Sequence, residues 1–116
     1  MEYNLKKFIP RHRNIKEDIS IGNGGNWYLN INFLNKEKIS SLRYDVMWSK
    51  DDRIVGFEFK DSGNYSLTKQ KKSDSMLVIG MYPTSALKEI GIKNFSGLHN
   101  LEKQGSIYFI KFGLDD

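Results

Sequence analysis

The sequence predicts a mainly β protein with short helices (α+β), organised as a small β-barrel from two similar β-α-β-β halves. Short runs of alternating apolar and polar residues recur along the chain, separated by turn residues. Two short helical patterns each follow one of these runs. The second half repeats the order of the first at an offset of 53 residues.

Length and composition favour one soluble domain. The chain has 116 residues and 39% hydrophobic residues, enough for a packed core. No apolar run approaches the roughly 20 residues that cross a bilayer, and the first residues lack the apolar core of a signal peptide. The absence of cysteine excludes disulfides and thiolate metal ligands. We therefore expect a cytoplasmic protein, and its net charge of +4 permits an acidic partner without requiring one.

Residues 1–18 are predicted to form a basic arm, followed by one compact domain over 19–116. Pro10 excludes a continuous helix in the arm. Two interpretations stay open, an arm that contacts phosphates and a solvated terminal segment.

The first pseudo-repeat, residues 19–60, opens with a predicted hairpin. Ile19–Ile21 and Trp27–Asn32 have strand patterns, and the glycines and asparagines of 22–26 suit a turn. No Gly-Lys-Ser or Gly-Lys-Thr sequence follows, and no helix opens directly from these glycines. We therefore favour a hairpin turn over a phosphate-binding loop.

A short helix and a second hairpin complete this repeat. Residues 33–41 suit the helix, with Asn30 or Asn32 as its N-cap. The pattern then predicts strands over 44–48 and 53–59, joined by a polar turn.

Residues 61–75 are polar, rich in lysine, and predicted to link the two halves. Tyr65 and Leu67 are candidates for a brief extended contact within this linker. A basic loop with one aromatic residue suits a nucleic-acid backbone, and it equally suits a solvated connection.

The second pseudo-repeat, residues 76–113, follows the same order. A strand over 76–80 precedes a helix that ends at Ile90, with Thr84 or Ser85 as its cap and Gly91 as its stop. The remaining pattern predicts a weak strand over 98–101, a turn over 102–105 and a strong strand over 106–112.

This second repeat resembles the swapped-hairpin domain of AbrB, MazE, SpoVT and MraZ. Members of that family have a strand, a proline, a short helix ending in Gly-Ile, and a hairpin. The matching residues are Val78, Ile79, Pro83, Leu87, Gly91, Ile92 and the hairpin from Leu98 to Phe112. MraZ carries two such units in one chain, as proposed here. The resemblance implies a DNA-binding transcriptional regulator, with a homodimer as one assembly.

We accordingly expect a non-enzymatic DNA-binding protein without a cofactor. His12 and His99 lie far apart, and no histidine-carboxylate spacing indicates a metal. Basic side chains would neutralise phosphates while the sheet sets their register. The candidates are Lys6, Lys7, Arg11, Arg13, Arg43, Lys69, Lys71 and Lys72.

Two other functions stay open. The first is a viral protein, from a phage or mobile element, that sequesters a host protein or an anionic nucleotide. Outward-facing members of the aromatic set would make its binding surface, and the candidates are Trp27, Tyr28, Tyr44, Trp48 and Tyr108. The second is a small enzyme, which would need a deep pocket where Glu58, His99 or a serine touch each other.

Overall fold

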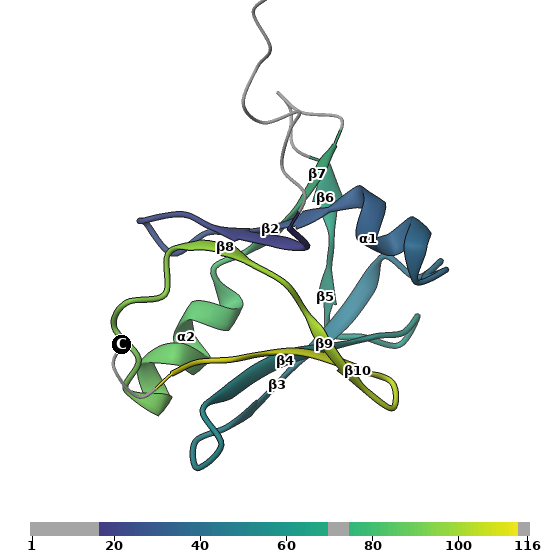
Figure 1. Ribbon diagram of the computed structural model, residues 1–116. Coiled ribbons are helices and arrows are strands. Elements are labelled where there is room, and N and C mark those ends of the chain that lie inside the picture. The colour runs from purple at the N-terminus through teal and green to yellow at the C-terminus, as the bar shows by residue number, and fades with distance from the viewer. Residues whose placement is uncertain (1–16, 70–74, 114–116) are drawn as a thin grey trace, which may run out of the picture.

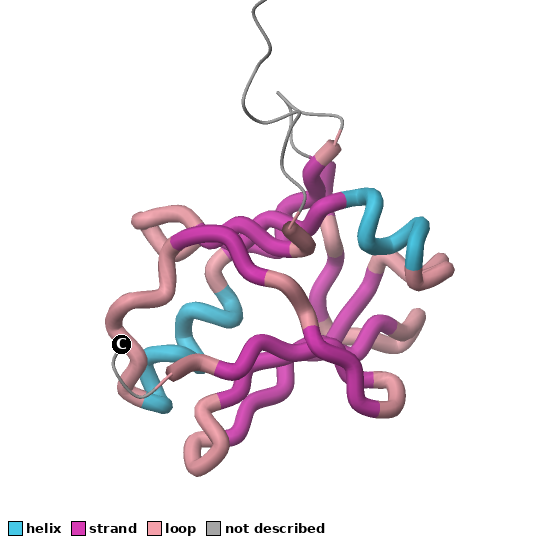
Figure 2. The backbone as a smooth tube through the Cα atoms, in the orientation of Figure 1, coloured by secondary structure: helices cyan, strands magenta, loops and turns pink. Residues whose placement is uncertain are grey.

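The computed structural model describes residues 17–69 and 75–113. Over these residues the protein is mainly β, with two antiparallel sheets and two helices, which confirms the predicted mainly β class with short helices. Figure 1 shows the sheet that contains β2 and β8 above the sheet that contains β3, β4 and β10. The two helices lie on opposite sides of this view, and Figure 2 shows how little of the chain they occupy.

Each sheet has five strands, and every pair of neighbours is antiparallel. Sheet A runs in the order β6 (Thr68–Lys69), β7 (Met76–Gly80), β2 (Trp27–Asn30), β1 (Ile19–Ile21) and β8 (Gly97–His99). Sheet B runs in the order β5 (Tyr65–Ser66), β3 (Arg43–Ser49), β4 (Ile54–Phe59), β10 (Ile107–Lys111) and β9 (Glu102–Gln104).

One apolar core lies between the sheets. Trp27 of sheet A packs edge-on against Phe57 of sheet B, with ring centroids 5.6 Å apart, and both side chains are fully buried. The buried hydroxyl of Tyr44 in sheet B donates to the carbonyl of Ile79 in sheet A at 2.8 Å. Burial raises the pKa of this phenol, with smaller contributions from Tyr82 and Tyr65, so Tyr44 keeps its proton and the bond.

The first predicted hairpin is confirmed, and the helix after it starts earlier than predicted. Residues 22–26 form the turn between β1 and β2. The side chain of Asn30 accepts from the backbone N–H of Asn32 at 3.0 Å, which makes it the N-cap of α1 (Ile31–Lys36). This cap ends the strand at Asn30, so Ile31 is helical.

The predicted helix end at Gly91 is confirmed, and the predicted cap is wrong. Gly91 has φ 93° after α2 (Tyr82–Ile90), and its N–H donates to the Leu87 carbonyl. The helix begins at Tyr82, its N-cap residue Met81 makes no side-chain hydrogen bond, and Pro83 occupies its first turn. Thr84 is not a cap, because its hydroxyl is buried between other partners.

The predicted linker contains an edge strand of each sheet. Tyr65 begins β5 in sheet B, and two residues later Leu67 is buried. The N–H of Leu67 donates to the Leu42 carbonyl at 2.7 Å, and the chain then enters sheet A as β6. The brief extended contact expected of Tyr65 and Leu67 is therefore confirmed.

The last hairpin differs from its prediction. The weak strand predicted over 98–101 corresponds to β8, which pairs with β1 in sheet A. Residues 102–104, predicted as a turn, form β9 and pair with β10 in sheet B. The carboxylate of Asp18 accepts from the N–H of Leu101 at 2.8 Å and anchors the chain where it passes between the sheets. The reversal falls instead at Gly105, with φ 62°.

Within the described ranges, no helix is long and apolar enough to span a membrane.

Candidate functional site

The two segments predicted to be most basic join the described domain at one place. The N–H of Asn30 donates to the Asp18 carbonyl at 2.8 Å, and its side-chain amide donates to the Glu17 carbonyl at 3.2 Å. The next residue, Ile31, donates its N–H to the Ser75 carbonyl at 2.9 Å. The described end of the N-terminal arm and Ser75, the residue that follows the 70–74 segment, therefore meet where β2 passes into α1.

Six of the eight predicted nucleic-acid contacts lie outside the described residues: Lys6, Lys7, Arg11, Arg13, Lys71 and Lys72. The structure places the other two in different sheets, Arg43 at the start of β3 in sheet B and Lys69 at the end of β6 in sheet A. The guanidinium of Arg43 donates to the Gly63 carbonyl at 2.8 Å and to the Ser66 hydroxyl at 3.0 Å, and so fixes the entry to β5. Lys69 is exposed on β6, three residues beyond Ser66.

Most of the net positive charge lies outside the described residues. These contain 11 of the 18 lysines and arginines but 10 of the 14 acidic residues, for a formal charge of +1. The rest of the chain therefore carries +3 of the total +4. An electrostatic partner of this protein would depend chiefly on the arm and on the 70–74 segment.

A charged network occupies the outer face of sheet B. The Lys60 ammonium lies 2.9 Å from Glu58 and 3.3 Å from Asp45. The Ser106 hydroxyl donates to Glu58 at 2.6 Å, and this bond, followed by Lys60, lowers the pKa of Glu58. The N–H of Asn64, with help from Lys60, lowers the pKa of Asp45. Hydrogen bonds to both carboxylates raise the pKa of Lys60.

Of the residues expected at the site of a small enzyme, Glu58 and a serine touch on sheet B, whereas His99 lies in sheet A. Glu58 touches Ser106, but its lowered pKa makes it a weaker general base than an ordinary glutamate. His99 lies on β8 in sheet A, with Nε2 2.9 Å from the Phe95 carbonyl and its ring against Phe112. Across residues 17–69 and 75–113, no three histidine or acidic side chains cluster as metal ligands.

A groove of about 530 Å³ with polar and aromatic walls lies between α2 and β3. Trp48 of β3 and Tyr82 of α2 line it and are 50% and 54% exposed. Tyr65 stacks on Tyr82 with centroids 4.2 Å apart, which presents two rings as one wall. Two acidic side chains, Asp45 and Glu89, are the charged residues of its lining.

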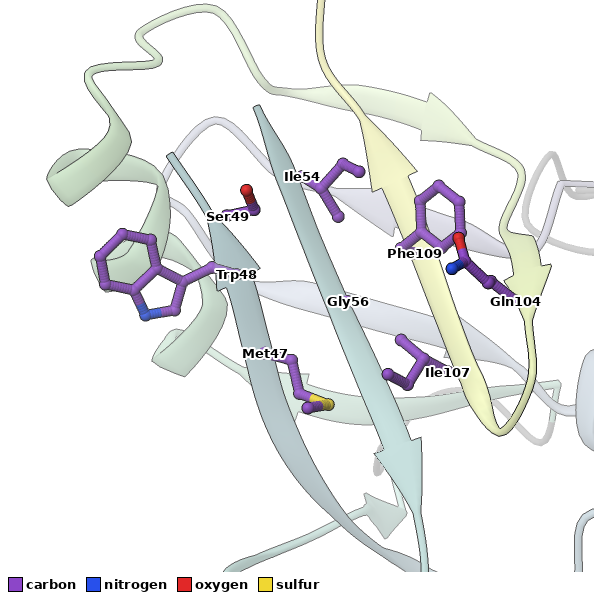
Figure 3. Close-up of a pocket in the computed structure, with 8 residues that line it drawn as sticks. All are labelled: Met47, Trp48, Ser49, Ile54, Gly56, Gln104, Ile107 and Phe109. Carbon is purple, nitrogen blue, oxygen red and sulfur yellow. The ribbon is translucent and has the colours of Figure 1, made fainter. Parts of the chain in front are cut away.

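A second hollow, of about 210 Å³, lies on the outer face of sheet B (Figure 3). Ile54, Ile107 and Phe109 line it around Gly56, where an added Cβ would lie only 2.7 Å from the Tyr108 carbonyl oxygen. Figure 3 shows Trp48 directed away from these residues, on the other side of β3. Trp48 also lines the groove against α2, so this exposed indole forms the ridge between the two hollows.

The sequence pattern identified only part of this surface. Of the five aromatic candidates, Trp27, Tyr44 and Tyr108 are buried, and Trp48 is the one with a largely exposed ring. Alternation along β3 indicated two faces, but it could not show that α2 leaves Trp48 uncovered. Tyr82, which begins α2 and is largely exposed, was missed as a site residue.

Comparison with known proteins identified no relative: no family model, no curated protein and no solved structure matches this chain.

Proposed function

We propose that the protein is a non-enzymatic DNA-binding protein. The bonds of Asn30 and Ile31 to Asp18 and Ser75 carry the proposal, because they bring the attachment points of the two basic segments together. Segments attached at one place can contact neighbouring phosphates of one duplex. Lys69 adds a cation at the near end of the second segment. Regulation of transcription, in the manner of AbrB and MraZ, is the role that the resemblance of the second repeat favours.

A mobility-shift titration with random-sequence duplex tests this function at about 50 mM and about 200 mM salt. We expect binding at low salt and a steep loss at high salt. Replacing Lys6, Lys7, Arg11 and Arg13 with glutamine should lower the salt slope by about 3 to 4, since each lost phosphate contact removes about 0.9.

The matched control removes the same charge from exposed positions of the described domain, by replacing Lys50, Lys88, Lys93 and Lys111 with glutamine. This variant should keep most of the salt slope. Absence of any shift at low salt would exclude DNA binding, and equal losses in the two variants would exclude the assigned contacts.

We further propose that the two sheets are the walls of a small barrel made from two similar halves. The register of the central pair supports this arrangement: Gly56 pairs with Phe109, its equivalent at the 53-residue offset. On either side Ile54 pairs with Lys111 and Glu58 with Ile107, which are again equivalent positions exchanged between the halves. A two-fold relation between the halves requires such an exchange.

A second candidate function is binding of a protein partner, favoured by the exposed indole of Trp48 between two hollows. Tryptophan and tyrosine are enriched among residues that dominate binding at interfaces. Pull-down from a lysate of the source organism should recover a protein with the wild type and lose it with Trp48→Ala. Lys88→Ala, on the same helix as Tyr82, should retain it. Equal recovery by wild type and Trp48→Ala would contradict this candidate.

A further inference from the structure

We propose that the groove between α2 and β3 binds an arginine-bearing peptide segment of a partner protein. This inference rests on the second candidate function, protein binding at Trp48, and is independent of DNA binding. The groove combines three features: exposed aromatic faces on both walls, a small-residue floor, and a carboxylate that no described residue engages.

The aromatic walls suit a planar cation. Trp48 stands on β3, and the stacked pair of Tyr65 and Tyr82 faces the groove from β5 and α2. Guanidinium groups stack on such rings, and tryptophan is the most favourable partner for a cation. Ala86 of α2 lines the groove between these walls, so a side chain can approach the helix closely.

The charge of the groove selects the sign of the ligand. Asp45 is already engaged by Lys60 and by the N–H of Asn64. Within the described part of the chain, no hydrogen bond or ion pair engages the carboxylate of Glu89. Since no basic side chain lines the groove, it disfavours an anionic nucleotide and complements a cation. Arginine fits better than lysine because its planar fork both stacks on a ring and pairs with a carboxylate.

The test is a titration of the full chain with the peptide acetyl-Leu-Arg-Leu-amide, observed through the NMR signal of the Trp48 indole N–H. The control peptide replaces arginine with citrulline, which keeps the shape and removes the charge. We expect saturable binding of the arginine peptide, with the citrulline peptide about 3- to 30-fold weaker, the range of a cation–π contact. Trp48→Ala should weaken binding of the arginine peptide by a similar factor. Because this variant lacks the indole signal, its affinity is measured by calorimetry.

Glu89→Gln should weaken the arginine peptide about 2- to 5-fold and leave the citrulline peptide unchanged. Glu102→Gln is the matched control, because Glu102 is an exposed carboxylate on β9 outside this groove. The affinity of the Glu102→Gln variant for both peptides should equal that of the wild type.

Four results would overturn the proposal. Equal affinity for both peptides would mean that the groove binds peptides regardless of their charge. Protein binding at Trp48 would then remain possible, but the preference for arginine would be wrong. Tighter binding of adenosine monophosphate than of the arginine peptide would assign the groove to an anion. Conversion of a dimer to a monomer by Trp48→Ala in sedimentation would assign it to a second copy of the chain. If Trp48→Ala leaves both peptide binding and protein recovery unchanged, the second candidate function fails together with the inference.

Discussion

At the scale of single residues, Thr84 shows how one hydroxyl joins distant parts of the chain. It accepts from the indole N–H of Trp27 at 3.0 Å and donates to the Gly25 carbonyl at 2.6 Å. All three residues are buried, so water cannot replace either bond. The hydroxyl therefore fixes the start of α2 against the turn between β1 and β2.

Thr84→Val removes this hydroxyl and keeps a side chain of similar shape. The Trp27 N–H and the Gly25 carbonyl would then lack a partner, and the free energy of unfolding should fall by about 1–3 kcal/mol. Urea denaturation measures the loss. Thr68→Val, at an exposed position on β6, is the control and should change the value by less than about 0.5 kcal/mol. Equal effects of the two substitutions would contradict the role of Thr84.

Lys60→Gln tests the charged network on sheet B through the pH dependence of thermal stability. The lowered pKa of Glu58 and Asp45 stabilises the fold above their ordinary values of 4.5 and 3.8, and this contribution disappears as pH falls through the folded values. The raised pKa of Lys60 stabilises the fold below 10.5, a contribution lost as pH rises through its folded value. The Tm difference between wild type and variant should therefore be largest between pH 4.5 and 10.5.

The same variant should raise the pKa of both carboxyl groups, measured by carbon NMR. Lys111→Gln, at an exposed position of β10, should move neither pKa. A Tm difference that does not shrink in acid would contradict the network.

At the scale of elements, α2 had a predictable end and an unpredictable beginning. The glycine after Ile90 is a local signal, because few other residues adopt φ 93°. The beginning depends on what surrounds Thr84. Its threonine side chain resembles a cap in sequence, but in the fold its hydroxyl has a buried indole as donor. Likewise, the polar sequence of β9 (Glu102–Gln104) predicts a turn. This segment becomes a strand because it pairs with β10.

Gly91→Ala should lower the free energy of unfolding by about 1 kcal/mol, because alanine is strained at this φ. No atom lies within 4 Å of the added carbon, so backbone strain is the whole effect. Gly91→Asn should cost less, since asparagine tolerates the left-handed region. Thermal denaturation ranks the variants, with Gly24→Ala as control at an open position without positive φ. Equal losses for alanine and asparagine would refute this explanation.

At the scale of the whole molecule, β4 and β10 join the two halves at the centre of sheet B. Ile110 pairs with Val55, and both side chains belong to the common core. A core shared in this way should unfold as one cooperative unit.

Ile110→Ala should therefore destabilise both halves together, by about 2–5 kcal/mol. Tryptophan fluorescence reports largely on Trp27 in the first half, and far-ultraviolet circular dichroism reports on all strands and helices. Their denaturation midpoints should shift equally. Two separated transitions would show that the halves are independent.

The sequence by itself determined the class of the fold, most strands, the first hairpin and the glycine end of α2. These features follow from local physics, namely alternation of apolar residues, turn chemistry and backbone conformation. Only the tertiary structure decided which strands share a sheet, why β8 leaves its expected hairpin for β1, and which aromatic residues stay exposed. Those outcomes depend on contacts between distant residues. Trp27 and Trp48 have similar strand contexts in the sequence, yet the core covers Trp27 completely and leaves Trp48 as a ridge beside the groove.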